Sequence, residues 1–298
     1  VGSDPHFGVP ERASIRDKVS QQMGQLDPDF VVIAGDIVDE GYYQSQWDSF
    51  FDHMDTYFTG SDDSIPIIPA LGNHDLPYWL YYEQFALPIV DPQYEEQWYS
   101  LNCGPDIHII VLNSEAKEYD GAMAAQTRWL EEDLEAHSSF PWKFAVFHRN
   151  DKPFKYGWDS LFDEYDVDIV FNGHWHGYFR TEQNGTMYVV TAAWEGGAFV
   201  LVDIFQDGTL HLQAKDDTGV TFDDAWVHKT LPQIGMELVG PLTEKTSEPV
   251  DPAKREHVPR AAAWNSGPAN AFTVSLPVIA LSYDDELRCK AKLIRRRL

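Results

Sequence analysis

The stretch Gly173-His174-Trp175-His176-Gly177 decides how the rest of the chain is understood. It follows an apolar run at residues 167–171 that is typical of a buried strand. Histidines at the end of such a strand project from the carboxyl edge of a sheet, where ligands bind in open α/β folds. Neutral imidazole is a common metal ligand. Because short motifs also arise by chance, the pair alone leaves two interpretations open, a metal site and a simple strand cap.

Four other predicted strand ends carry side chains of the same kinds. The strands are a stub at the start of the chain and short apolar runs near residues 30–34, 65–70 and 143–147. In chain order, the five ends carry Asp4 and His6, then Asp36, then Asn73 with His74 and Asp75, then His148, and last His174 and His176. Five of the 11 histidines therefore lie at strand ends, which chance placement does not explain. We expect the other six (His53, His108, His137, His211, His228 and His257) to be structural or surface residues.

These side chains form the ligand set of a hard metal ion. Carboxylate, amide oxygen and imidazole without thiolate suit Mn, Fe or Zn. Cys103 and Cys289 lie in no CxxC motif, which argues against a thiolate zinc site, and whether they pair is left open. Asp36 follows a glycine that allows close backbone approach, and it is the natural carboxylate to bridge two ions. The pattern predicts two divalent or trivalent ions, which clamp a phosphate and lower the pKa of a bridging water.

The ordered motifs D-x-H, G-D-x-x-D, G-N-H-D, a lone histidine and G-H-x-H resemble those of the calcineurin-like metallophosphoesterase superfamily. The section from Trp98 to Arg180 is similar to its purple-acid-phosphatase-like branch. The resemblance spans about residues 1–215 and implies an α/β (α+β) fold, a four-layer α-β-β-α sandwich of two mixed sheets flanked by helices. We expect residues 1–215 to form the catalytic domain. Residues 216–298 are expected to be a C-terminal extension with a long loop, packed on the same domain.

The resemblance also implies roles for individual residues. It assigns Asp4, His6, Asp36 and His176 to one metal, and Asp36, Asn73, His148 and His174 to the other. His74, held by Asp75, would face the phosphate as the catalytic group that stabilises charge or protonates the leaving oxygen. Asn73 and Arg149 are candidate phosphate contacts, with a surface ion pair equally open for Arg149. Trp175 is expected to point away from the ions and to pack into the wall.

Two departures narrow the resemblance. Asp39 stands where true purple acid phosphatases have a tyrosine ligand, so we expect neither a charge-transfer colour nor an obligatory ferric ion. The motif continues as Asp39-Glu40-Gly41 instead of the D-R-G of phosphoprotein phosphatases, which argues against that activity. Asp39 is expected to be a structural acid beside the ligands.

The predicted function is hydrolysis of small phosphate esters by in-line attack of a metal-bridging hydroxide, with monoesters slightly favoured. Alternatives are a phosphodiesterase for cyclic nucleotides or other small diesters and, less favoured, a non-catalytic binding scaffold. The net charge of -26 repels polyanions, which argues against a nuclease and against extended nucleic acid as a partner. No apolar run is long enough to predict a membrane span. Val1-Gly2-Ser3 lacks an initiator Met, so we expect an upstream segment and leave location and oligomeric state open.

Overall fold

The computed structural model describes residues 1–59, 64–117, 121–230, 280–283 and 289–292. The helices are η1 Pro10–Arg12, α1 Ala13–Gln25, α2 Gln44–Tyr57, α3 Trp79–Gln84, α4 Ala122–Ala136, α5 Lys152–Tyr156, α6 Trp158–Glu164 and η2 Trp194–Gly196. The strands are β1 Val31–Ala34, β2 Ile67–Ala70, β3 Tyr99–Cys103, β4 Ile107–Val111, β5 Trp142–Val146, β6 Ile169–Asn172, β7 Tyr178–Gln183, β8 Thr186–Thr191, β9 Ala198–Ile204, β10 Thr209–Asp216, β11 Thr221–His228, β12 Ala280–Tyr283 and β13 Cys289–Lys292. Within the described residues no helix combines the length and apolar character needed to cross a membrane.

The larger sheet has six strands in the order β3-β4-β5-β6-β8-β7. Its four central strands run parallel, and β3 and β7 pair antiparallel at the two edges. Both faces of the central strands are covered: on β4, Ile109 and Val111 enter the core between the sheets, while Ile110 contacts the helices on the other side. Burial on both faces explains why these strands read as continuous apolar runs without alternation.

In the smaller sheet, the first residues of the chain connect the β1–β2 pair to the three strands β9, β10 and β11. Val31 of β1 pairs parallel with Ile67 of β2, and Gly2 bridges to Ile33 on the other edge of β1. Val1 exchanges two backbone hydrogen bonds with Val200 of β9, from which β10 and β11 continue antiparallel. The first residues thus lie between β1 and β9, and this central position fixes the segment that carries Asp4 and His6.

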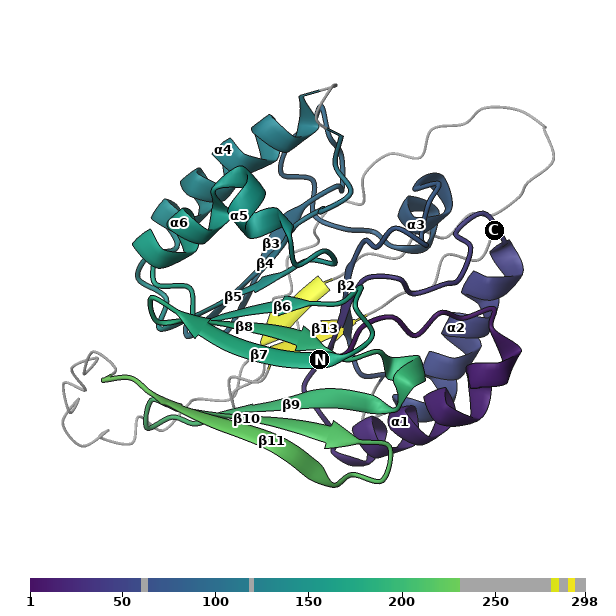
Figure 1. Ribbon diagram of the computed structural model, residues 1–298. Coiled ribbons are helices and arrows are strands. Elements are labelled where there is room, and N and C mark those ends of the chain that lie inside the picture. The colour runs from purple at the N-terminus through teal and green to yellow at the C-terminus, as the bar shows by residue number, and fades with distance from the viewer. Residues whose placement is uncertain (60–63, 118–120, 231–279, 284–288, 293–298) are drawn as a thin grey trace, which may run out of the picture.

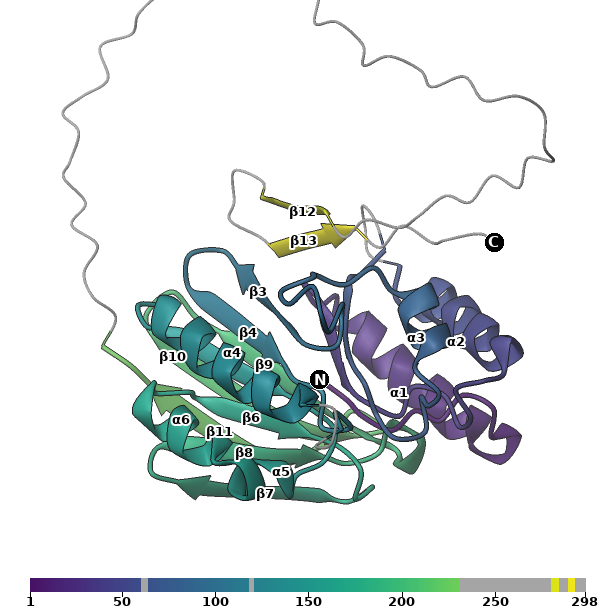
Figure 2. The same ribbon diagram turned by 90° about the horizontal axis from the view of Figure 1, so that it is seen from above.

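The molecule is layered as the resemblance implied (Figures 1 and 2). Helices α4, α5 and α6 cover the outer face of the six-stranded sheet, and α1 and α2 lie beside the smaller sheet. One hydrophobic core fills the space between the sheets, and a second, with Leu130 and Phe162, lies under α4 and α6. The predicted α/β class, with helices flanking mixed sheets, is confirmed.

Some elements lie outside the predicted pattern. Strand β11 pairs with β10 beyond residue 215, where no strand was expected. Its side chains are largely exposed, as on an edge strand, so its apolar periodicity is weak. At the far end, β12 pairs antiparallel with β13. The predicted long loop at 243–270 and the side chain of Cys289 lie outside the described residues.

Candidate metal centre

The predicted ligand residues meet at one edge of the sandwich. Asp36 follows β1, Asn73 follows β2, His148 follows β5, and the two histidines of the opening motif follow β6. Their ligand atoms form three overlapping groups in which every atom lies within 4.8 Å of the others. The first group is Asp4, His6 and His176; the second is Asp36, His148 and His174; a third joins His6, Asp36 and His74. The tertiary structure therefore brings together residues spread over about 170 positions of sequence.

Asp36 lies at the centre of these groups. Its Oδ2 atom is 3.0 Å from His148 Nε2 and 3.4 Å from His6 Nε2. Its Oδ1 atom accepts a 2.7 Å hydrogen bond from the backbone N–H of His74. The residue is only 1% exposed. Burial opposes ionisation of Asp36, but the hydrogen bonds with His148 and His6 outweigh burial and lower its pKa. An ionised carboxylate thus lies between imidazoles of two different groups.

The remaining contacts hold each group together. In the first, His176 Nε2 is 3.4 Å from Asp4 Oδ1, and the Asp4 carboxylate accepts the backbone N–H of His174 at 3.0 Å. In the second, His148 Nε2 lies 3.2 Å from Asn73 Oδ1. Its Nδ1 lies 2.9 Å from the carbonyl oxygen of Ala34. That carbonyl can only accept, so it favours a proton on Nδ1 and leaves Nε2 facing the centre.

The backbone is strained where these side chains converge. A positive φ occurs at Asp4, His6, Asp36, His174 and His176. Such conformations cost non-glycine residues about 1–3 kcal/mol each and persist where the surroundings enforce them, often at functional sites. Glycines make room next to the ligands: a Cβ at Gly35 would lie 2.6 Å from His148 Nδ1, and one at Gly72 would lie 2.2 Å from Asp36 Oδ1. The backbone therefore adopts costly conformations at the positions where the candidate ligand side chains come together.

The electrostatics fit a site for cations. Burial disfavours charge on His6 and His148, yet the adjacent Asp36 outweighs burial and raises the pKa of each to about 9. Buried Asp4 and Asp36 thus draw positive charge toward them. A metal ion would supply that charge, and the nitrogen and oxygen donors present, without sulfur, fit Mn, Fe or Zn.

His74 has a different partner from the one expected. Its Nδ1 lies 2.7 Å from the carbonyl oxygen of Asp39 and 3.8 Å from Asp39 Oδ1. Asp75 instead accepts the backbone N–H groups of Gly72 and Val38. The expected support of His74 by Asp75 is therefore wrong, because the Asp75 carboxylate is buried inside the turn while the side chain of His74 is 43% exposed. Burial raises the pKa of Asp75 to about 7, as suits a structural acid.

Trp175 also differs from expectation. It is 67% exposed instead of packed into the wall. His174 and His176 on either side of it have positive φ, and their imidazoles contact the Asp36 and Asp4 groups while the indole has most of its surface in solvent. The indole is therefore an exposed aromatic surface next to the candidate metal centre.

Arg149 lies at the rim of the centre and forms an ion pair, one of the two interpretations expected for it. Its Nε donates to Glu115 Oε1 at 2.8 Å, which is an ion pair, and its Nη1 lies 2.9 Å from His174 Nε2. Its backbone N–H donates to Ser114 Oγ. The loop that holds Ser114 and Glu115 is fixed by Gln126, whose side-chain amide bonds both the N–H and the carbonyl of Asn113.

Glu195 and Arg16 are site residues that sequence reasoning missed. Glu195 lies against His6 and His176, and Arg16 donates hydrogen bonds to the carbonyls of Pro5, His6 and Val9. Both are buried. The signal for Glu195 was a lone acid directly after the apolar run 187–194, because acids are rarely buried without a partner.

A further histidine cluster joins β4 to α4. His108 Nε2 lies 2.8 Å from Asp133 Oδ2, and its ring stacks on His137 at 4.0 Å. Ser100 donates to Asp133, and His108 Nδ1 lies 2.7 Å from Asn102 Oδ1. These protein partners suit the structural role expected for His108 and His137.

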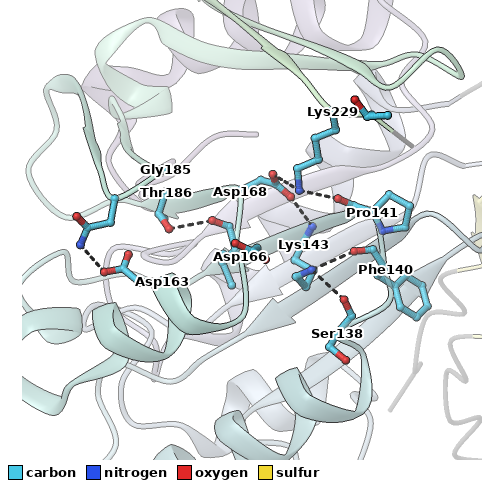
Figure 3. A pocket seen from close by; sticks show the side chains of 13 residues that line it. Ser138, Phe140, Pro141, Lys143, Asp163, Asp166, Asp168, Gly185, Thr186 and Lys229 are labelled. Carbon is cyan, nitrogen blue, oxygen red and sulfur yellow. Dashed lines mark hydrogen bonds and ion pairs between the residues drawn. The ribbon is translucent and has the colours of Figure 1, made fainter. Parts of the chain in front are cut away.

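A cavity of about 400 Å³ lies at the opposite end of the larger sheet, where β5, β6 and β8 begin (Figure 3). Both of its lysines have protein partners. Lys229 pairs with Asp168 and donates to the carbonyl of Pro141, and Lys143 donates to the carbonyls of Ser138 and Phe140. The cavity is therefore separate from the candidate metal centre, and its lysines already have partners.

Comparison with known proteins agrees with this geometry. The family model described as calcineurin-like phosphoesterase matches residues 1–178. Purple acid phosphatase 13 of Arabidopsis thaliana is 30% identical over 207 residues, 59% of this chain and 35% of that protein. An uncharacterized protein of Mycobacterium tuberculosis is 29% identical over 194 residues, 53% of this chain and 35% of that protein. The chain thus spans about a third of the length of these curated relatives.

Solved structures show the same fold. Purple acid phosphatase PPD1 from yellow lupin seeds superposes with a TM-score of 0.58 at 20% identity, covering 72% of this chain and 49% of that one. GAP50, titled the anchor in the inner membrane complex of Plasmodium, gives a TM-score of 0.61 at 12% identity, covering 77% and 87%. With a family model matched over more than half of its length, the chain belongs to the calcineurin-like phosphoesterase family.

Proposed function

We propose that the protein is a metal-dependent phosphoesterase acting on small phosphate esters, with monoesters favoured. The observation that supports this most directly is the position of Asp36, whose Oδ2 lies between His148 and His6 of two different ligand groups. One carboxylate shared between two groups is what a two-metal phosphoesterase requires. The other predicted ligand residues lie around it.

The ligands divide between two ions in this proposal. Asp4, His6, Asp36 and His176 would hold the first metal, and Asp36, Asn73, His148 and His174 the second. When bound, such ions polarise a phosphoryl oxygen and lower the pKa of a bound water. The protein's contribution is to hold these side chains close together on turns whose backbone has positive φ at five of the seven ligands.

His74 is proposed as the group that meets the phosphate. Its ring centroid lies 4.7 Å from that of His6, and its side chain is accessible from solvent. The carbonyl of Asp39 accepts a hydrogen bond from Nδ1–H and so fixes the ring orientation, leaving Nε2 for substrate. Asp39 takes the orienting role that Asp75 was expected to have. Substrate charge or a leaving oxygen would be stabilised at His74 Nε2.

Arg149 is proposed as a phosphate contact that becomes available when metal binds. Its guanidinium now donates to His174 Nε2, which requires a lone pair on that nitrogen. A neutral His174 that ligates a metal through either nitrogen has no free lone pair left for Arg149. Metal binding would therefore release Nη1, while Glu115 still holds Nε at the rim. A guanidinium so held suits bidentate phosphate binding.

Asp36→Ala tests the proposal because it removes the shared ligand. We expect the wild-type protein, loaded with Mn, Fe or Zn, to hold two ions and hydrolyse nitrophenyl phosphate. The variant should lose both metal pairing and activity, measured by mass-spectrometric metal analysis and by nitrophenolate release. Asp223→Asn, on β11 away from the centre, is the control for loss of a carboxylate. Full metal content with retained activity in Asp36→Ala would overturn the bridging role.

A comparison of hydrolysis rates on a monoester and a diester tests which substrate class the protein prefers. Rates on nitrophenyl phosphate and on bis-nitrophenyl phosphate, with the same metal loading, give the preference directly. The similarity to proteins named purple acid phosphatases supports the proposed preference for monoesters. A higher kcat/KM for the diester would overturn that preference while leaving the phosphoesterase proposal intact.

A non-catalytic scaffold is the second candidate, because one structural neighbour is titled an anchor. The complete ligand set in this chain favours the enzyme. Protein purified without chelator that holds well under one metal ion, and gains no activity with added Mn, would favour the scaffold.

A further inference from the structure

We propose that Glu195 is a positioning residue that orients the two histidines of the first metal site, His6 and His176. The inference rests on the proposed metal centre and adds to it a residue outside the ligand motifs. Glu195 is only 6% exposed, and its Oε1 atom lies 3.2 Å from His6 Nδ1 and 3.7 Å from His176 Nδ1. One carboxylate oxygen therefore faces both imidazoles.

The Nε2 atoms of the same two rings face the carboxylates of the candidate metal centre. His6 Nε2 lies 3.4 Å from Asp36 Oδ2, and His176 Nε2 lies 3.4 Å from Asp4 Oδ1. The two rings are thus arranged alike, with Nδ1 toward Glu195 and Nε2 toward the centre. A carboxylate that accepts a hydrogen bond from Nδ1–H fixes this tautomer and leaves the Nε2 lone pair for a metal ion. Glu195 lies within hydrogen-bond distance of His6, whereas at 3.7 Å it acts on His176 through its charge.

The segment that carries Glu195 is tied to the segment that carries the ligands. Trp194, fully buried, donates its backbone N–H to the carbonyl of Ser3 at 2.7 Å, and Ser3 bridges to Ala193. Across the loop, Arg16 donates to the carbonyls of Pro5 and His6, and its charge attracts that of Glu195. Glu195 therefore has a fixed position relative to His6, as an orienting group needs.

The second site has no such carboxylate within the described residues. There His148 Nδ1 meets the neutral carbonyl of Ala34 instead. Because a carboxylate raises the basicity of a ligating imidazole more than a carbonyl does, Glu195 should strengthen the first site selectively. Loss of such an orienting partner typically costs about 10–100-fold in metal affinity.

The experiment isolates each site before Glu195 is changed. His148→Ala removes a ligand of the second site, and His6→Ala removes a ligand of the first. Glu195→Gln, which keeps the shape and removes the charge, is made in the wild-type, His148→Ala and His6→Ala proteins. Glu182→Gln, an exposed acid on β7, is the matched control. Zinc affinity is measured by competition with a chromophoric chelator, and circular dichroism checks that each variant is folded.

The expected result is selective. Glu195→Gln should weaken zinc binding about 10–100-fold in the His148→Ala protein and less than about threefold in the His6→Ala protein, with no effect of Glu182→Gln. Equal affinities in the His148→Ala background with and without Glu195 would overturn the positioning role, yet leave the metal centre standing. Wild-type protein that binds no zinc at all would overturn both. Equal losses in both backgrounds would show a general structural role and also overturn the inference.

Discussion

At the scale of single residues, the centre depends on side chains whose partners fix their direction. Asp36 is held by His74 N–H and two imidazoles, and His148 is held by the carbonyl of Ala34. His74 differs, because its side chain reaches solvent and its Nδ1 is oriented by the carbonyl of Asp39. These differences separate the proposed metal ligands from His74, the residue proposed to meet the substrate.

His74→Ala should therefore separate catalysis from metal binding. We expect turnover of nitrophenyl phosphate to fall about 10²–10⁴-fold, because a positioned general acid or charge stabiliser is lost. Metal content should stay at the wild-type level, since His74 is in neither proposed ligand set. His228→Ala, an exposed histidine on β11, is the control. A loss of metal as large as in Asp36→Ala would instead make His74 a ligand, as its grouping with His6 and Asp36 allows.

At the scale of elements, the turn after β6 shows how a strand end presents its ligands. Gly173 packs against the N-terminal segment: a Cβ there would lie 2.6 Å from Asp4 Oδ2 and 2.8 Å from the carbonyl oxygen of Ala34. At Gly177, at the other end of the same turn, an added Cβ would lie 3.9 Å from the nearest atom among the described residues, the carbonyl oxygen of Trp175. The two glycines of one motif therefore face different constraints.

Gly173→Ala and Gly177→Ala form a matched pair. We expect Gly173→Ala to displace Asp4, weaken metal binding and lower the free energy of unfolding by about 1–3 kcal/mol, because the added methyl overpacks a rigid site. Gly177→Ala should change both quantities little. Urea unfolding and metal analysis measure these effects. Equal tolerance of the two substitutions would contradict the close contact at Gly173.

A second element-scale feature joins the two sheets. Asp223 of β11 accepts hydrogen bonds from Arg180 Nε at 2.7 Å and from the Tyr178 hydroxyl at 2.6 Å, both on β7. The bond from Arg180, with that from Tyr178, lowers the pKa of Asp223 to about 2. The ionised carboxylate is therefore favoured in the folded protein over the unfolded one.

Asp223→Asn should lower stability in a pH-dependent way. The depressed pKa means that the contribution is complete above about pH 4, the ordinary pKa of Asp, and is lost as the pH falls toward 2. For this partly exposed pair we expect the substitution to lower the free energy of unfolding at pH 7 by about 1 kcal/mol, after allowance for solvent screening. Urea unfolding at pH 7 and at pH 3 measures the difference between variant and wild type. A difference that grows on acidification would contradict the assignment.

At the scale of the whole molecule, charge is the dominant surface property. The chain carries 48 acidic and 22 basic residues, and few of the acids lie in the metal centre. Excess charge of one sign keeps a protein soluble and destabilises its compact state through self-repulsion. The same field disfavours polyanionic substrates but acts weakly on a small ester at a cationic site.

Salt should therefore stabilise this protein. Raising NaCl from 50 to 500 mM shortens the screening length from roughly 14 to 4 Å, and we expect the Tm to rise by a few degrees. Differential scanning fluorimetry at pH 7.5, with metal loading held constant, measures it. KCl should act like NaCl, since screening depends on ionic strength. A Tm that falls or stays level with added NaCl would contradict net self-repulsion.

The sequence by itself predicted which residues meet at the candidate metal centre, because carboxylates, an amide and imidazoles at the ends of apolar strands have few other physical uses. It also determined the α/β class, since buried strands alternate with amphipathic helices. Edge strands β7 and β11 escaped prediction because their side chains are half in solvent and carry little apolar period.

Only the tertiary structure decided which neighbours orient the ligands. Because Asp75 is adjacent to His74 in the chain, the sequence suggested that Asp75 orients the His74 imidazole. In the structure the Asp75 carboxylate bonds the backbone of the turn, and the carbonyl of Asp39 contacts the imidazole instead. Glu195 reaches His6 across 189 positions because residues 1–3 insert between β1 and β9. The candidate ligands in the motif from Gly173 to Gly177 can thus be recognised from the sequence. The residues that surround each imidazole are decided by strand pairing between distant segments.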